Sequence, residues 1–190
     1  MGKHLGVLAL QGAFREHRQM LEPLNTQVHE VRLPQDLKGL SGLIIPGGES
    51  TTMVKLIKAY GFDTALPDFY ESGAAIWGTC AGAIVLAKEI VGYPEQYRLG
   101  LLDITIARNA YGRQVDSFEV DLEAKVLDSP FHAIFIRAPR IMDVGEGVDI
   151  LASYGENPIW VQQGRLMASV FHPELSHDSR IHQYFLGLCD

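Results

Sequence analysis

Positive charge, cysteine and long hydrophobic runs are all scarce in this sequence. Its 190 residues include 16 lysines and arginines against 23 aspartates and glutamates, which gives a formal net charge of -7. A protein that binds a polyanion needs a basic surface, so this balance argues against DNA or RNA as a partner. No apolar run approaches the roughly 20 residues of a membrane-spanning helix, so we expect no membrane association.

The chain has only two cysteines, Cys80 and Cys189. Two cysteines cannot provide the disulfide framework of a small secreted protein. The N-terminal stretch has a short apolar run without the small-residue cleavage site of a secretory signal, so it predicts a buried strand. We therefore expect a reduced, cytoplasmic protein.

Glycine and proline are spread along the chain instead of being pooled in a linker. The 19 glycines and nine prolines lie between apolar runs, as is typical of tight turns. With 47% hydrophobic residues and no internal repeat, the chain can bury one core. We expect residues 1–190 to form a single domain.

The first half alternates apolar runs with segments of helical periodicity. Four short runs predict strands buried on both faces: residues 4–10, 28–33, 42–45 and 74–77. Three segments predict helices: residues 14–24, 53–60 and 83–90. Such an alternation favours a parallel sheet that lies between helices.

The second half contains more extended segments, several of which we expect to be antiparallel. They are residues 101–108, 114–120, 131–138, 148–153, 158–163 and 166–171. A tight turn at residues 163–165 would join the last two segments, and residues 181–188 predict an amphipathic closing helix. The whole pattern predicts a three-layer α/β fold with a mixed, mostly parallel sheet.

The segment Gly-Thr-Cys-Ala-Gly at residues 78–82 has the spacing of a nucleophile elbow, with sulfur in place of oxygen. Glycines flanking such a nucleophile permit a sharp turn between strand and helix, above the carboxyl edge of the sheet. The helix N-terminus also favours a thiolate. Cys80 is therefore a candidate nucleophile. The five-residue motif alone is equally compatible with a small cysteine buried in the core. Cys189 has no such context, and we assign it no role.

A thiolate that attacks an amide needs an acid to protonate the leaving ammonia, and histidine suits that role near neutral pH. His172 follows a strand-like run and precedes Pro173 and Glu174. Residues i and i+2 of an extended chain point the same way, so Glu174 could orient the imidazole as the third member of a triad.

A solvated surface pair and a metal site are alternatives for His172 and Glu174. The metal site is the weaker alternative, because His-Pro-Glu supplies at most two ligands and His177 and His182 fit no zinc spacing. The other histidines have no comparable context, and we interpret them as structural: His4, His17, His29 and His132.

Backbone donors for a tetrahedral oxyanion are predicted after the strand at residues 42–45. The paired Gly47 and Gly48 allow backbone N–H groups to approach a ligand, and the Ala81 amide directly follows the candidate nucleophile. A phosphate cradle is disfavoured, because the Walker spacing and its lysine are absent. A plain turn remains an alternative.

Seven segments together resemble the glutaminase subunits of pyridoxal 5'-phosphate synthase, a family of triad glutamine amidotransferases. They are residues 10–17, 46–53, 78–82, 108–109, 112–118, 135–139 and 171–175. The elbow and His-Pro-Glu are common to glutamine amidotransferases, whereas Arg-Asn, Gly-Arg-Gln and Phe-Ile-Arg-Ala-Pro are typical of this subunit. Departures are slight: Trp77 and Tyr111 replace the usual Phe, and Ser176 replaces Thr.

The resemblance implies a flavodoxin-like, class I glutamine amidotransferase fold and a site for L-glutamine. Its catalytic residues would be Cys80, His172 and Glu174, and its substrate-binding residues Gly48, Glu49, Ser50, Arg108, Ile136 and Arg137. The oxyanion hole would comprise Gly47, Gly48 and Ala81. Arg108 and Arg137 suit a substrate carboxylate, because guanidinium presents a planar fork to two oxygens, although solvated surface arginines are the alternative.

The resemblance further implies that no cofactor or metal is needed and that the synthase subunit is a partner in a hetero-oligomeric complex. That subunit would receive the ammonia, and its docking would raise the glutaminase activity. Residues 11–17 are a candidate contact surface. Two rival hypotheses are a glutaminase that feeds another acceptor, such as an imidazole-building synthase, and a non-catalytic or redox-sensing protein that keeps the elbow cysteine.

Overall fold

A seven-stranded sheet forms the centre of the molecule, in the order β10-β11-β12-β4-β3-β1-β2. The computed structural model describes residues 2–108 and 117–189. Neighbouring strands pair in parallel from β2 to β12: β2 (Gln27–Val31), β1 (His4–Leu8), β3 (Gly42–Ile45), β4 (Ala75–Thr79) and β12 (Leu166–Ser169). Two antiparallel strands complete one edge, β11 (Asn157–Gln163) and β10 (Asp149–Tyr154).

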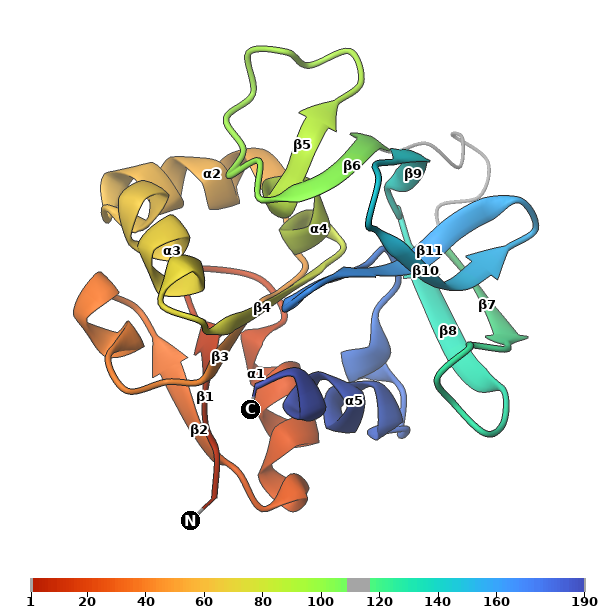
Figure 1. Ribbon diagram of the computed structural model, residues 1–190, viewed down its shortest axis with the longest axis horizontal. Coiled ribbons are helices and arrows are strands. Elements are labelled where there is room, and N and C mark those ends of the chain that lie inside the picture. The colour runs from red at the N-terminus through yellow and green to blue at the C-terminus, as the bar shows by residue number, and fades with distance from the viewer. Residues whose placement is uncertain (1, 109–116, 190) are drawn as a thin grey trace.

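Helices cover both faces of this sheet (Figure 1). One face carries α2 (Ser50–Ala59), α3 (Phe62–Glu71) and α4 (Ala81–Leu86), and the other carries α1 (Phe14–Leu21) and α5 (Arg180–Leu188). The inner strands are apolar because both faces are covered, and every residue of β3, β4 and β12 is buried. Short 3₁₀ turns follow α1, β2 and β12: η1 (Glu22–Leu24), η2 (Pro34–Leu37) and η3 (Pro173–Leu175).

Two smaller sheets lie beside the central one (Figure 1). The first contains β5 (Ala87–Ile90), β6 (Leu102–Ala107) and β9 (Arg140–Val144), and the second is the hairpin of β7 (Ser117–Leu122) and β8 (Phe131–Ile136). Phe131 and Phe135 of β8 are buried, and both pack on the buried Phe171 that follows β12. This packing holds the ends of β8 and β12 close together.

The predicted three-layer α/β fold with a mixed, mostly parallel sheet is confirmed. The helix predicted over residues 83–90 is wrong in its second half, since α4 ends at Leu86 and β5 begins at Ala87. Leu99 N–H donates to the Val85 carbonyl, and β5 pairs in parallel with β6. These long-range bonds override a sequence that favours helix.

Several other boundaries differ from the sequence prediction. The first predicted helix is divided into α1 and η1, and the predicted strands at residues 4–10 and 166–171 end two residues early. Helix α3 and strand β9 were not predicted. The predicted strand at residues 114–120 continues to Leu122 as β7. Residues 109–116, which include Asn109, Tyr111, the Gly-Arg-Gln motif and the predicted start of that strand, lie outside the described residues. Within the described ranges, none of the helices has the length and apolarity needed to traverse a membrane.

Candidate active site

Cys80 lies at the sharp turn between β4 and α4, at the carboxyl edge of the sheet. Its φ of 50° is unusual for a residue with a side chain, and such strain is often found at functional sites. The turn is fixed from the neighbouring strand, because Cys80 N–H donates to the Ser169 carbonyl at 2.8 Å. Cys80 is 8% exposed, so the residue is buried but not completely enclosed.

Both glycines of the elbow are required by close backbone contacts. A Cβ on Gly78 would lie 2.4 Å from the Gly82 carbonyl oxygen, and a Cβ on Gly82 would lie 2.0 Å from the Ile45 carbonyl oxygen. Backbone atoms cannot withdraw as a flexible side chain can. The G-x-C-x-G spacing therefore has a steric cause, namely the close packing of α4 against β3 and β4.

His172 lies beside Cys80, Glu174 lies beneath the His172 imidazole, and both residues are buried. His172 N–H donates to the Ile134 carbonyl of β8 at 2.8 Å, and His172 Nδ1 lies 2.7 Å from Glu174 Oε1. The extended conformation predicted for residues 172–174 is wrong. Residues 173–175 form the turn η3, which brings the carboxylate under the imidazole by a different backbone path.

The protonation of this pair follows from its surroundings. Burial tends to lower the pKa of His172, but its interactions with Cys80 and Glu174 outweigh burial and raise that pKa to about 10. Burial tends to raise the pKa of Glu174, yet His17 and His172 hold it below its usual value. At neutral pH the imidazole is therefore a cation next to an ionised carboxylate, with a proton available beside the sulfur.

The loop between β3 and α2 approaches both catalytic side chains. A Cβ on Gly47 would lie 2.7 Å from His172 Cε1 and 3.3 Å from Cys80 Cβ, so only glycine fits there. The loop is held from behind by the segment before α1. Ala13 N–H donates to the Gly47 carbonyl at 3.2 Å, and the Gln11 amide exchanges two hydrogen bonds with the Glu49 backbone, each 3.3 Å long.

A cavity of about 270 Å³ opens at Cys80. It is lined by Gly48, Glu49, Ser50, Cys80, Ala81, Ile84, Arg108, Ile136, Arg137, Pro139 and His172. The structure thus brings together all six residues that the resemblance implied for substrate binding, and it places them beside the candidate nucleophile and histidine. Gly47 lies behind the wall, against His172, and Glu174 is covered by that imidazole.

Arg108 is fixed in this cavity by residues that sequence reasoning missed. Its Nη1 donates to Gln96 Oε1 at 2.6 Å, its guanidinium stacks on Tyr93 at 4.5 Å, and its Nη2 lies 3.9 Å from Glu49 Oε1. Gln96 and Tyr93 lie in an irregular segment between β5 and β6 without periodicity or a motif. No local signal in the sequence points to them.

Glu49 has a structural role in addition to its place in the cavity. As the N-cap of α2 its carboxylate accepts hydrogen bonds from Thr51 and Thr52, from both backbone and side chain. These bonds, led by the Thr51 hydroxyl, outweigh burial and lower the pKa of Glu49 to about 2. The cavity therefore holds a permanent negative charge close to the positive charge of Arg108.

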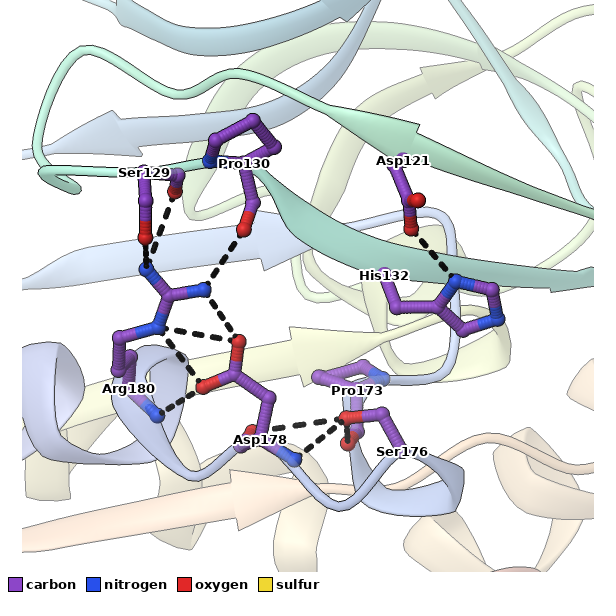
Figure 2. A network of polar contacts seen from close by, with 8 residues as sticks. All are labelled: Asp121, Ser129, Pro130, His132, Pro173, Ser176, Asp178 and Arg180. Atoms are coloured by element: carbon purple, nitrogen blue, oxygen red, sulfur yellow. Dashed lines mark hydrogen bonds and ion pairs between the residues drawn. The ribbon is translucent and has the colours of Figure 1, made fainter.

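The turn that carries Glu174 is anchored on its far side by Arg180, the first residue of α5 (Figure 2). Its guanidinium binds the Asp178 carboxylate and donates to the Ser129 and Pro130 carbonyls before β8. Ser176 Oγ donates to the Pro173 carbonyl at 2.8 Å, so serine retains the hydroxyl that threonine would provide. These bonds fix η3 relative to β8, the strand that also binds His172.

Comparison with known proteins agrees with this geometry. A model of the SNO glutamine amidotransferase family matches residues 7–190. The chain belongs to this family. Among the relatives of this glutamine amidotransferase is the pyridoxal 5'-phosphate synthase subunit PdxT of Deinococcus radiodurans, with 61% identity over 97% of this chain and 96% of that protein. The PdxT subunit of Thermus thermophilus is 57% identical over the same shares of the two chains.

Solved structures with similar folds support the α/β fold described above. A crystal structure of a glutamine amidotransferase superposes with a TM-score of 0.94 at 55% identity, covering 97% of this chain and 98% of that one. The structure of PurLQS from Thermotoga maritima shares the fold at 17% identity, with a TM-score of 0.75. The family resemblance inferred from sequence is confirmed.

Proposed function

We propose that this chain, acting as one glutaminase domain, hydrolyses L-glutamine to L-glutamate and ammonia through a thioester on Cys80. One observation carries the proposal: the thiol, a cationic histidine and two arginines meet in a single cavity of about 270 Å³. That combination supplies a nucleophile, a proton donor and partners for an α-carboxylate.

In the first half-reaction the Cys80 thiolate attacks the side-chain carbonyl carbon of glutamine. The oxyanion that forms is stabilised by backbone N–H groups at Ala81 and at the Gly47 to Gly48 segment. His172 then donates its proton to the amide nitrogen, the C–N bond breaks, and ammonia leaves the thioester. Glu174 keeps the imidazole in one tautomer and stabilises its cationic form.

In the second half-reaction a water molecule attacks the thioester carbon while His172 accepts a proton from that water. The C–S bond breaks, the Cys80 thiolate is regenerated, and glutamate dissociates. Arg108 and Arg137 bind the α-carboxylate of substrate and product as planar donors. The ionised Glu49 faces the α-ammonium group, while Ser50 and Ile136 complete the wall around the glutamine side chain.

The ammonia is proposed to reach the synthase subunit of pyridoxal 5'-phosphate synthase in a hetero-oligomeric complex in the cytoplasm. The names of the PdxT relatives support this assignment. Residues 11–17 are proposed as part of the contact surface, because Gly12 and Arg15 are exposed while Gln11 contacts the Glu49 backbone. A partner bound there would act on the loop that carries the oxyanion donors.

The test is the release of glutamate and ammonia from glutamine, measured with and without the synthase subunit. Cys80→Ala should abolish the reaction, whereas Cys189→Ala, the same chemical change far from the cavity, should retain it. A wild-type rate for Cys80→Ala would disprove the nucleophile. Stimulation by an imidazole-building synthase instead of the pyridoxal one would favour a different acceptor, and failure of a glutamine-like alkylating analogue to label Cys80 would favour a redox sensor.

A further inference from the structure

Two histidines without a predicted catalytic role are buried behind Glu174: His17, which was interpreted as structural, and His182, which fits no zinc spacing. His17 of α1 and His182 of α5 are both fully buried. His17 Nδ1 lies 2.9 Å from His182 Nε2, and His17 Nε2 lies 3.1 Å from Thr79 Oγ1. The same Nε2 atom lies 3.5 Å from Glu174 Oε2. The pair thus connects α5 and α1 to the carboxylate beneath His172.

The Glu174 carboxylate has unequal surroundings at its two oxygens. Oε1 accepts from His172 Nδ1 at 2.7 Å. Oε2 is buried, and among the described residues it has no hydrogen bond of standard geometry; His17 Nε2 is the facing nitrogen. A buried carboxylate oxygen without a donor is costly. Among the described side chains, His17 is the one that places a nitrogen close enough to stabilise Oε2.

The protons of the histidine pair can be assigned from the surrounding groups. Burial lowers the pKa of both His17 and His182, so each ring is neutral and has one N–H. If His182 Nε2 donates to His17 Nδ1, then His17 Nε2 carries a hydrogen, and its two neighbouring acceptors are Thr79 Oγ1 at 3.1 Å and Glu174 Oε2 at 3.5 Å. His182 Nδ1 is then bare, which agrees with its lack of a hydrogen bond among the described residues.

The opposite assignment is disfavoured at both ends. His17 Nδ1–H would donate to His182 Nε2, which would place the second hydrogen on His182 Nδ1, a buried atom with no acceptor among the described residues. His17 Nε2 could then accept only from the Thr79 hydroxyl, and its lone pair would lie close to an ionised carboxylate. Both faults cost free energy, because a buried donor without an acceptor is worse than a buried acceptor without a donor.

We propose that His17 is a positioning residue of the triad: its neutral Nε2–H, fixed in that tautomer by His182, holds Glu174 Oε2 so that Oε1 stays under His172. The inference rests on the proposed catalytic role of Glu174. Trp77 encloses the histidine pair, with its ring 5.5 Å from that of His17 and 4.9 Å from that of His182, and so keeps the hydrogen bonds dry. Thr79, bound to the same nitrogen, directly precedes Cys80.

His17→Leu and His17→Gln are the variants that test this role, with the glutaminase measured in the presence of the synthase subunit. His17→Leu removes the donor, so kcat should fall ~10- to 100-fold, as for other groups that orient a catalytic ligand, with KM changed less than about twofold. His17→Gln offers an amide N–H near the same place and should recover most of the loss. Thermal unfolding of each variant shows whether it is folded.

A double-mutant cycle with Glu174→Gln then separates positioning from a general loss of structure. If His17 acts through Glu174, adding His17→Leu to Glu174→Gln should reduce kcat by less than about threefold. Multiplied losses, a normal kcat in His17→Leu, or an equal loss in a folded His17→Gln would overturn the inference. A normal rate for Glu174→Gln alone would overturn the triad assignment as well, which distinguishes the two failures.

Discussion

The Nδ1 atom of His172 and the Oε1 atom of Glu174 are 2.7 Å apart, and both residues are more than nine-tenths buried. Two features of the backbone hold the His172 and Glu174 side chains at this distance. The turn η3 folds the carboxylate back under the ring, and the bond from His172 N–H to the Ile134 carbonyl fixes the backbone before the turn. A charged hydrogen bond in such an enclosed place is stronger than one exposed to water.

Glu174→Gln should leave the fold intact and lower turnover by ~10²- to 10⁴-fold. The amide NH₂ group of glutamine can donate to His172 Nδ1 and so stabilise the tautomer without a hydrogen on that atom, which is wrong for catalysis. Steady-state glutaminase kinetics with the synthase subunit present would measure the loss. Glu156→Gln, the same substitution on the turn between β10 and β11, is the matched control and should be silent. A near-normal rate in Glu174→Gln would reduce Glu174 to a structural residue.

Stability should depend on pH through His172. Its pKa is raised from 6.5 to about 10 in the folded protein, so the folded state binds this proton more tightly than the unfolded state. The resulting stabilisation is complete below pH 6.5 and is lost as pH rises toward 10. Urea unfolding between these limits should show a falling free energy, and His172→Gln should flatten that part of the profile. An unchanged slope in the variant would contradict the assignment.

Sequence reasoning was most successful where a physical constraint is local. Gly78, whose added Cβ would meet the Gly82 carbonyl, and the short apolar runs of β1, β3 and β4 express steric and burial demands that operate within a few residues. Gly82 was found through its motif, because its own close contact is with Ile45 of β3. The same reasoning failed at residues 87–90, where helical propensity gives way to pairing with β6. That partner begins at Leu102, well beyond any local window.

The candidate site divides in the same way. Cys80, His172 and the cavity residues were named from motifs, but their supporting residues were not. His17 is 62 positions from Thr79 and 165 from His182, and Gln96 has no periodic context around it. Such residues become visible only when strands and helices distant in sequence meet, since an isolated histidine or glutamine is usually structural or solvated.

Gly82→Ala should destabilise the protein by about 2–4 kcal/mol, because the new methyl group meets backbone and α4 must shift away from β3. Its Cβ would lie 2.0 Å from the Ile45 carbonyl oxygen. Gly187→Ala in α5 is the matched control, since none of the described residues outside its own helix turn comes within 4 Å of its Cβ position. That change should be neutral or stabilise by up to about 1 kcal/mol through helix propensity. Equal unfolding midpoints for the two variants would show that the elbow tolerates a side chain.

Substrate affinity should depend on the geometry of Arg108 more than on its charge. Lysine keeps the charge but loses the planar fork, so Arg108→Lys should raise KM for glutamine ~10- to 100-fold, with a smaller change in kcat. Arg165→Lys, whose guanidinium contacts only the Gly73 carbonyl in the described structure, is the matched control and should leave KM unchanged.

Gln96→Leu tests whether Gln96 holds the Arg108 guanidinium in place, while Arg108 itself is unchanged. It removes the acceptor 2.6 Å from Arg108 Nη1 and a donor 3.4 Å from Ser50 Oγ, and among the described residues it leaves the Tyr93 ring and Glu49 as partners of Arg108. The guanidinium should then sample more orientations, so KM should rise by about 3- to 10-fold, less than in Arg108→Lys, because the planar guanidinium itself is still present to bind the substrate. Initial rates over a glutamine series measure both variants. A larger effect of Gln96→Leu than of Arg108→Lys would mean that Gln96 binds the substrate directly.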